Sequence, residues 1–276
     1  MKKIIVPIDF SEHSEYALRA AATIAKKENA EVIALHMLEL SDTVLTKADS
    51  EKDMETVFYL KLAEKKFNEF LEKPYLKDVN VTPLVKHFKV FSEISAVADE
   101  QKVDLIIMGS HGTSGLSELF VGSNTEKVVR YSNVPVLVVK NDVEASTFDN
   151  VVYATDFSEA SIPAFKKAIS ILSAGVVLHL LHVNVPGDSF KSSDEIEAKV
   201  TSFLEKADGN LDRLPLVHYV SDYTVERGIL NHAAKHNLDL IAVSTHGRTG
   251  ISHFFEGSIS EDVANHSSLP VMTFKL

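Results

Sequence analysis

Two glycine-containing segments, one in each half of the chain, have residue types that suit the binding of a phosphate group. The first reads Gly109-Ser110-His111-Gly112, continues for nine residues and resumes as Gly122-Ser123. Glycine lets backbone N–H groups approach an anion closely, and a helix that begins near Ser123 adds unpaired N–H donors and about half a positive charge. The pattern predicts a phosphate-binding loop, and the plainer alternative is an ordinary strand–loop–helix turn.

The second segment departs from the first at its opening residue. It reads Ser244-Thr245-His246-Gly247, nine residues, and then Gly257-Ser258. The Cβ and hydroxyl of Ser244 either crowd a ligand or bond to it. Arg248 adds a cation that can pair with phosphate. We expect a weaker site here than in the first half.

Two carboxylates, Asp9 and Asp156, each follow the first apolar run of their half, at the carboxyl end of an expected strand. They are interpreted either as ligand-binding groups or as cap and turn residues before the first helix. Their recurrence opposite the glycine loops favours binding in the first half.

The histidines allow more than one interpretation. His111 and His246 lie inside the loops, where a ring serves as a phosphate donor or general base, or more often packs the loop. His36 and His182 end the second apolar run of each half, where a buried, hydrogen-bonded ring is favoured.

A metal site is not expected from the sequence. His232 and His236 lie four residues apart on an expected helix and so share a face, but no third ligand can be identified near them. Glu118 and Glu256, in the loops, are interpreted as solvated surface rather than as groups that steer Mg²⁺.

Several catalytic signatures are absent from the sequence. It contains no Walker A Gly-Lys-Ser/Thr, no Gly-x-Gly-x-x-Gly after a strand, no Gly-x-Ser-x-Gly and no His-Glu-x-x-His. Cys 0 excludes disulfides, thiolate catalysis and Cys-ligated metals. An enzyme such as a slow ATPase would have only Asp9 and His111 as plausible parts, so catalysis is not favoured.

Composition is that of a globular protein, with 276 residues of which 45% are hydrophobic and 24% charged. The formal charge of −11 disfavours binding to nucleic acid and anionic lipid. Apolar runs are strand-sized, well short of the roughly 20 residues that cross a bilayer. We expect a cytoplasmic protein without a membrane segment.

The chain repeats itself. The segments that return are short apolar runs with the polar residues after them: Ile4–Glu12 as Val151–Glu159, Val32–Met37 as Leu178–Val183, Asp104–Gly112 as Asp239–Gly247, and Val134-Pro135-Val136 as Leu269-Pro270-Val271. A tandem duplication follows, with a first domain at 1–141, a linker at 142–149 and a second domain at 150–276.

Strand and helix patterns alternate within each copy. In the first copy we expect strands at 4–8, 31–38, 81–86, 104–109 and 135–140, and helices after Ser11 or Ser14 and at 52–72, 92–101 and 123–132; in the second, a helix at 191–206. Such alternation predicts an α/β domain, an open five-stranded parallel sheet with helices on both faces. In these sheets, ligands bind beyond the carboxyl ends of the strands at the switch point. Asp9, Met37 and the loop 109–123 converge there.

The motif Gly109-x-x-Gly112-(nine residues)-Gly122-Ser123, together with Asp9-Phe10-Ser11-Glu12, resembles the universal stress protein family in its tandem-domain form. The resemblance covers nearly the whole chain, twice, and implies two Rossmann-like domains of the adenine nucleotide alpha hydrolase-like kind. It also implies an adenine nucleotide ligand such as ATP, with Mg²⁺ as an accompanying ion.

By this resemblance, the residues that hold the nucleotide are assigned by position. In the first domain they are Asp9 and Met37 at the base, and Gly109, His111, Gly112, Gly122, Ser123 and Asn124 at the ribose and phosphates. In the second they are Asp156, Val183, Gly247, Gly257 and Ser258.

Two functions stay open at this point. One is an ATP-binding regulatory protein of the stress response, and the alternative is a nucleotide-free interaction scaffold that uses the same pocket for another ligand or a partner. The last strands, 135–140 and 270–275, each leave an exposed sheet edge. Since domains of the resembled family pair through this strand, we expect the two halves to form an intramolecular pseudo-dimer, with a homodimer as a further arrangement.

Overall fold

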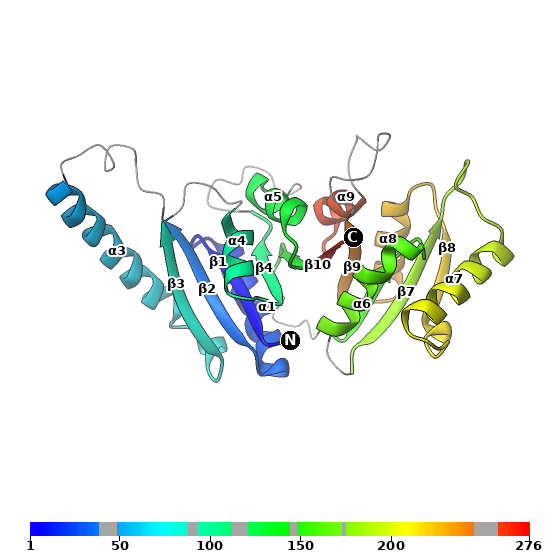
Figure 1. The fold of residues 1–276 in the computed structure, drawn as a ribbon, viewed down its shortest axis with the longest axis horizontal. Coiled ribbons are helices and arrows are strands. Elements are labelled where there is room, and N and C mark those ends of the chain that lie inside the picture. The colour runs from blue at the N-terminus through cyan, green and yellow to red at the C-terminus, as the bar shows by residue number, and fades with distance from the viewer. Residues whose placement is uncertain (39–48, 88–92, 112–120, 144–147, 173–174, 246–258) are drawn as a thin grey trace.

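The protein is described here from a computed structural model that covers residues 1–38, 49–87, 93–111, 121–143, 148–172, 175–245 and 259–276. Ten strands form one sheet in the order β3-β2-β1-β4-β5-β10-β9-β6-β7-β8 (Figure 1). Within each half, neighbouring strands are parallel and the first strand lies between the second and the fourth. The predicted pair of Rossmann-like α/β domains is confirmed.

The elements of the first half follow the predicted alternation. The strands are β1 (Lys3–Ile8), β2 (Glu31–Leu38), β3 (Asn80–His87), β4 (Leu105–Gly109) and β5 (Val136–Val139). The helices are α1 (Glu12–Glu28), α3 (Asp49–Leu71), α4 (Glu93–Glu100) and α5 (Ser123–Tyr131), with a 3₁₀ turn at Pro74–Leu76.

The second half repeats this order. Its strands are β6 (Asn150–Ala154), β7 (Val177–Asn184), β8 (Val217–Ser221), β9 (Leu240–Thr245) and β10 (Val271–Lys275). Its helices are α6 (Ile162–Ile171), α7 (Ser193–Ala207), α8 (Val225–Lys235) and α9 (Ile259–His266), with 3₁₀ turns at Glu159–Ser161 and Leu214–Leu216.

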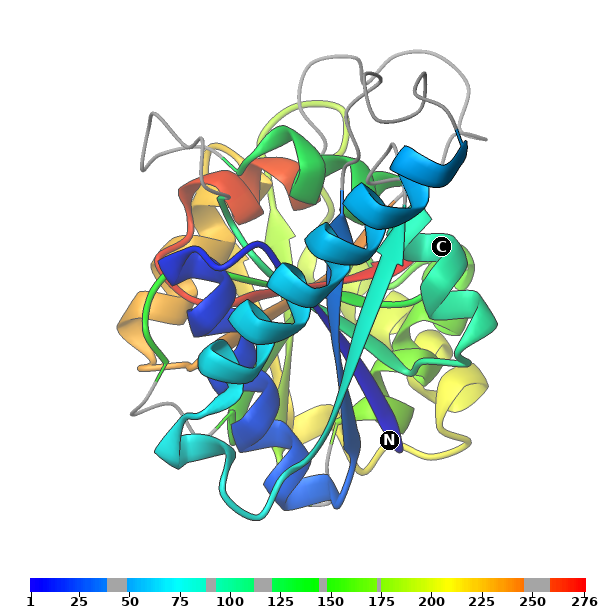
Figure 2. The ribbon, with the colours of Figure 1, turned by 90° about the vertical axis from the view of Figure 1, so that its left-hand side faces the viewer.

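Apolar residues fix the layers. In β1, Ile4 and Ile5 point to opposite faces and are both fully buried, because helices cover the two sides of the sheet. On one face, α1 and α3 pack with α6 and α7 in a single core cluster. On the other, α4 and α5 cover the first half, and α8 and α9 cover the second, over two separate clusters. Viewed from the side, α3 lies obliquely across the outer strands of the first half (Figure 2).

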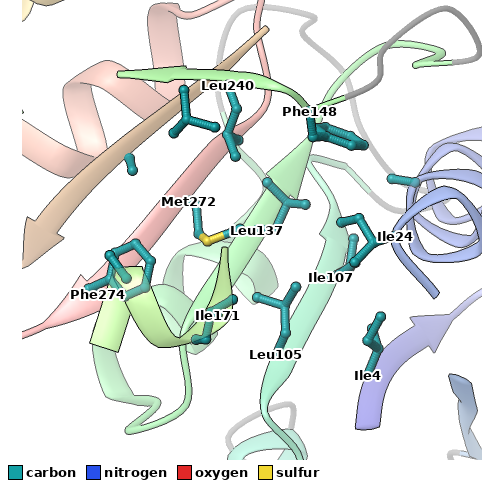
Figure 3. Packing of buried hydrophobic residues seen from close by; sticks show 14 of the residues in the cluster. Ile4, Ile24, Leu105, Ile107, Leu137, Phe148, Ile171, Leu240, Met272 and Phe274 are labelled. Atoms are coloured by element: carbon teal, nitrogen blue, oxygen red, sulfur yellow. The ribbon is translucent and has the colours of Figure 1, made fainter. Parts of the chain in front are cut away.

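The two halves meet at the antiparallel pair of β5 and β10. Val138, Leu137 and Val136 lie opposite Val271, Met272 and Thr273 in turn. Leu137 and Met272 belong to the core cluster that continues from one half into the other (Figure 3). The last strands therefore bury apolar side chains across the junction as well as pairing their backbones.

Among the described residues, no helix combines the length and apolar character that crossing a bilayer requires.

Candidate functional site

The carboxyl ends of β1 and β4 bring the predicted residues of the first half to one edge of the sheet. β1 lies between β2 and β4. The chain leaves β1 at Asp9 and leaves β4 after Gly109. Adjacent strands whose connections go to opposite faces open a crevice between them, which is where α/β domains bind ligands.

Asp9 shapes the turn between β1 and α1. Its Oδ1 accepts hydrogen bonds from the amide of Ser11 at 3.0 Å and from the Ser11 hydroxyl at 2.5 Å. Ser11 in turn caps α1, because its Oγ accepts from the amide of Ser14 at 3.2 Å. The turn interpretation of Asp9 is thus confirmed, and the same bonds fix its carboxylate at the mouth of the crevice.

Phe10 makes this turn unusual. Its φ of 65° lies in the left-handed region, which bulky residues rarely adopt. Its ring packs 4.6 Å from the His36 ring, and His36 Nδ1 lies 2.8 Å from the backbone oxygen of Ile8. The His36 ring therefore has the partly buried, hydrogen-bonded place expected of it. Met37 follows at the end of β2, beyond the last residue of β1, with its side chain partly buried against the core.

Gly109 ends β4 in direct contact with α1. A Cβ at Gly109 would lie 2.6 Å from the backbone carbon and oxygen of His13 and 2.8 Å from its Cβ, so only glycine fits. The Thr125 hydroxyl donates to the Gly109 backbone oxygen at 2.9 Å. These contacts bring the start of the loop, the start of α1 and the start of α5 together.

The two ends of the loop are joined by a backbone hydrogen bond. The Gly122 amide donates to the Ser110 oxygen at 2.6 Å. Ser110 is fully buried, and its hydroxyl lies 2.9 Å from Nδ1 of His111. The His111 ring lies 5.3 Å from the His13 ring. His111 is therefore placed at the crevice but held by neighbours, and Gly112 lies outside the described residues.

Helix α5 begins at this point without a side-chain cap. Its N-cap residue, Gly122, has φ −62° and ψ 147° and makes no side-chain hydrogen bond to the helix. Ser123 and Asn124 occupy the first turn, whose amides have no intrahelical partner. An anion placed here would accept hydrogen bonds from these amides and gain from the helix dipole.

A residue of the other half also reaches this loop. Asn265, in α9, accepts a hydrogen bond at its Oδ1 from the Val121 amide at 2.8 Å, and its backbone oxygen accepts one from the Lys140 ammonium. Local sequence patterns do not reveal this contact. Only the antiparallel junction, which sets α5 beside α9, could have suggested it (Figure 1).

The second half repeats the turn but differs around it. Asp156 Oδ1 accepts from the Ser158 amide at 2.9 Å, Phe157 has φ 55°, and Asp156 forms an ion pair with Lys199 at 3.9 Å. Burial lowers the pKa of His182, which lies two residues before the end of β7, as His36 lies two residues before the end of β2. Gly247, Gly257 and Ser258 lie outside the described residues, as do His246, Arg248, Glu118 and Glu256.

Val183, the counterpart of Met37, is buried under α8. A Cβ at Gly228 would lie 2.5 Å from Cγ1 of Val183, so this glycine allows α8 to pack closely on β7. A surface pocket of about 400 Å³ lies farther out on this half, at the ends of β7 and β8, lined by Asn184, Pro186, Phe190, Ser221, Asp222 and Tyr223. It lies on the outer strands rather than between β6 and β9, so it is distinct from the predicted crevice.

Comparisons with known proteins agree with the repeat. The profile of the Universal stress protein family matches residues 1–140 and again residues 147–275. The universal stress protein MJ0577 of Methanocaldococcus jannaschii is 36% identical over 155 residues, which span 50% of this chain and 94% of that protein. A universal stress protein of Mycolicibacterium smegmatis is 26% identical over 291 residues, 99% of this chain and 96% of that one.

A solved structure shows the same architecture over the full length. The crystal structure of a universal stress protein from Archaeoglobus fulgidus matches 99% of this chain and 98% of its own, with a TM-score of 0.73 and 25% sequence identity.

Proposed function

Because this chain belongs to the universal stress protein family, with one such domain in each half, we propose that it is a stress-response protein that binds ATP or another adenine nucleotide. The nucleotide occupies the first-domain crevice between the ends of β1 and β4. Its occupancy biases the conformation of the domain and so regulates what the protein contacts. We propose domain boundaries of 1–141 and 150–276, joined by a linker at 142–149.

The observation that supports a phosphate site most strongly is the start of α5. The N-cap residue is Gly122, and no side chain caps the first turn of the helix. The Gly122 amide also bonds to the Ser110 oxygen, which joins the two ends of the loop at this point. No Lys or Arg occurs between 109 and 124. The phosphates would therefore be held by main-chain amides, with the Ser123 hydroxyl and Asn124 amide beside them.

At the other end of the crevice, Asp9 and Met37 would meet the base. Asp9 is anchored by Ser11, so its orientation is set before a ligand arrives. Met37 extends past β1, which leaves its backbone at the open end of the ladder. Mg²⁺ that enters with ATP would be held mainly through the phosphates.

The second domain is proposed as the weaker site. Asp156 is exposed and ion-paired with Lys199, and Val183 is covered by α8. The two domains are proposed to stay paired through their last strands in solution, which the β5–β10 register supports. A cytoplasmic location stays a prediction, as does homodimer formation.

Equilibrium dialysis with ATP, together with mass spectrometry of small molecules released from the purified protein, tests this function. We expect ATP to bind with a dissociation constant of about 1 mM or lower. It should also raise the melting temperature, because a ligand that binds only the folded state stabilises it. A protein that carries no nucleotide and shows no binding or thermal shift would instead be the interaction scaffold. Catalysis is not part of this proposal.

A further inference from the structure

Four histidines from three elements of the second domain gather on one face of the sheet. His179 comes from β7, His218 from β8 and His232 from the last turns of α8, and His236 is the C-cap residue of that helix. His179 Nδ1 lies 2.9 Å from His218 Nε2. The His218 ring centroid lies 5.0 Å from that of His232 and 5.8 Å from that of His236, and the latter two are 4.3 Å apart. We call these four residues the histidine cluster.

The cluster lies at the opposite edge of the sheet from the crevice. His179 and His218 stand near the starts of β7 and β8, while the crevice lies beyond the strand ends. Helix α8 runs back along the sheet, so its last turn carries His232 to the same place. A ligand of the cluster would therefore occupy a place separate from the crevice.

The first domain shows that the fold does not require histidine at these positions. By the internal repeat and the strand registers, the counterparts of His179, His218, His232 and His236 are Ile33, Leu84, Val97 and Gln101. Ile33 and Val97 are buried in the apolar core of that domain, and Leu84 packs against it. The fold thus accepts apolar side chains at three of these positions, whereas the second domain has histidine at all four.

One of these imidazoles is buried with an unsatisfied nitrogen. The His232 side chain is 5% exposed, and its Nε2 is buried without a hydrogen-bond partner. A buried polar atom left unpaired is unfavourable, because it has lost its hydrogen bonds to water. A bound ion would satisfy this nitrogen, because a neutral imidazole offers the lone pair of its unprotonated nitrogen to a metal.

We propose that the histidine cluster binds one divalent transition-metal ion, with Zn²⁺ as the expected occupant. Neutral imidazole is a preferred ligand of Zn²⁺, at about 2.0–2.1 Å from the metal in a tetrahedral arrangement. Two rings so bound have centroids about 5 Å apart, and His218 already stands 5.1 Å from His179 and 5.0 Å from His232.

Binding requires a small rearrangement. As the side chains stand, no three His, Asp or Glu groups in the described part of the chain surround a common point as metal ligands would. The hydrogen bond between His179 and His218 holds a ring proton where the ion would sit. Moving that proton to the other nitrogen of the same ring frees both lone pairs, and ring rotation aims them at the ion. His236 is exposed, so the ion enters from solvent beside it.

The test is calorimetric titration of ZnCl₂ into nucleotide-free, full-length protein that has been treated with a chelator. We expect one Zn²⁺ per chain. The variants carry the first-domain residues, His218→Leu and His236→Gln, and each should weaken binding at least about tenfold. His266→Ala, which removes an imidazole in α9, should leave binding unchanged. Co²⁺ in place of Zn²⁺ should give the visible absorption of a tetrahedral site in the wild type and lose it in His218→Leu.

His236→Gln alters an exposed side chain, so it is expected to fold even if a core variant does not, and circular dichroism checks each protein. Equal Zn²⁺ affinities for the wild type, His218→Leu and His236→Gln would overturn the proposal. So would the absence of any stoichiometric binding by the wild type, or an equal loss of binding in His266→Ala.

Discussion

The backbone of His13 occupies the space that a side chain at Gly109 would need, since a Cβ at Gly109 would lie 2.6 Å from the His13 backbone carbon and oxygen. The first helix thus packs directly on the residue at which the loop after β4 begins. At the matching position of the second domain, Ser244 has a Cβ that is accommodated. The counterpart of His13 in that domain is Ala160. It lies in the 3₁₀ turn Glu159–Ser161, where the first domain has the first turn of an α-helix.

Gly109→Ala should therefore destabilise the protein and weaken ATP binding together. Either α1 or the loop must shift, and forcing extra volume into such contacts costs about 1–3 kcal/mol. Urea unfolding and ATP dialysis measure the two effects. Ser244→Ala is the matched comparison, because a Cβ already exists there and no volume is added. It removes only the hydroxyl that interacts with Tyr153, so its cost should stay near that of one hydrogen bond, about 1 kcal/mol, with the affinity of the first domain unchanged. Full stability and affinity in Gly109→Ala would show that the contact with His13 is not fixed.

Asn265→Ala should weaken ATP binding although the residue belongs to the second domain. It removes the acceptor of the Val121 amide, next to Gly122. Loss of one such bond is worth about 1 kcal/mol, or roughly a fivefold change in affinity. Lys275→Met provides the control, because the Lys275 ammonium also bonds across the junction, to Asn133, but away from the loop. Equal affinities in the two variants would mean that the second domain does not position the loop.

A pair of cysteines tests the strand pairing, and the absence of cysteine from the chain makes the readout unambiguous. Val136 and Thr273 face each other across β5 and β10. Directly opposed residues of antiparallel strands have Cβ atoms about 4.5–5.5 Å apart, near the spacing that a disulfide accepts. Val136→Cys with Thr273→Cys should oxidise to an intramolecular disulfide, seen as a faster monomer band on a non-reducing gel.

The control pair is Val136→Cys with Phe274→Cys. A shift of one residue points the second thiol to the other face of the sheet, so no bond should form. A disulfide in the control pair, or its absence in the opposed pair, would contradict the register. A dimer band in the opposed pair would place the pairing between chains.

Stability should fall as the pH drops below about 6.5, in part through His182. Burial, together with the charge of Lys199, lowers the pKa of His182, against the raising effects of the Thr155 backbone and Asp156. The unfolded chain therefore binds a proton at a higher pH than the folded one. The stabilisation is complete above about pH 6.5 and is lost as the pH falls toward the folded pKa.

His182→Phe removes this contribution, so the urea midpoint should fall less between about pH 7.5 and pH 5.5 than in the wild type. Some dependence should remain, because the pKa values of His179, His218 and His232 are also lowered by burial. An identical pH dependence in the variant and the wild type would show that His182 does not titrate differently in the folded state.

Local patterns were enough to predict the strands, because buried parallel strands are continuous β-branched runs such as Ile4–Ile8. They also gave the turn role as one of two interpretations of Asp9, and Ser11 as one of two candidate caps, and the structure shows both. The two halves differ at the start of this helix. Ser158 matches Ser11 in the repeat, but its side chain makes no capping hydrogen bond. Helix α6 begins only at Ile162, with Pro163 in its first turn.

Contacts between distant segments could not be read in the same way. Asn265 and Val121 meet because the two last strands pair, and no local pattern encodes that meeting. The pair His232 and His236 was visible on its helix, but His179 and His218 join it only through the strand order. The gathering of the four rings therefore could not be predicted from the sequence.

The central claim is that main-chain amides at the start of α5 hold a polyphosphate, and the most direct test is to compare ATP with adenosine. Both should use Asp9 and Met37, but only ATP uses the loop. We predict that the wild type binds ATP at least about tenfold more tightly than adenosine, a difference of about 1.4 kcal/mol. In Gly122→Val, whose Cβ would lie 3.2 Å from the Ser110 oxygen, the two affinities should become nearly equal. Equal affinities in the wild type, or an unchanged ratio in Gly122→Val, would contradict the account.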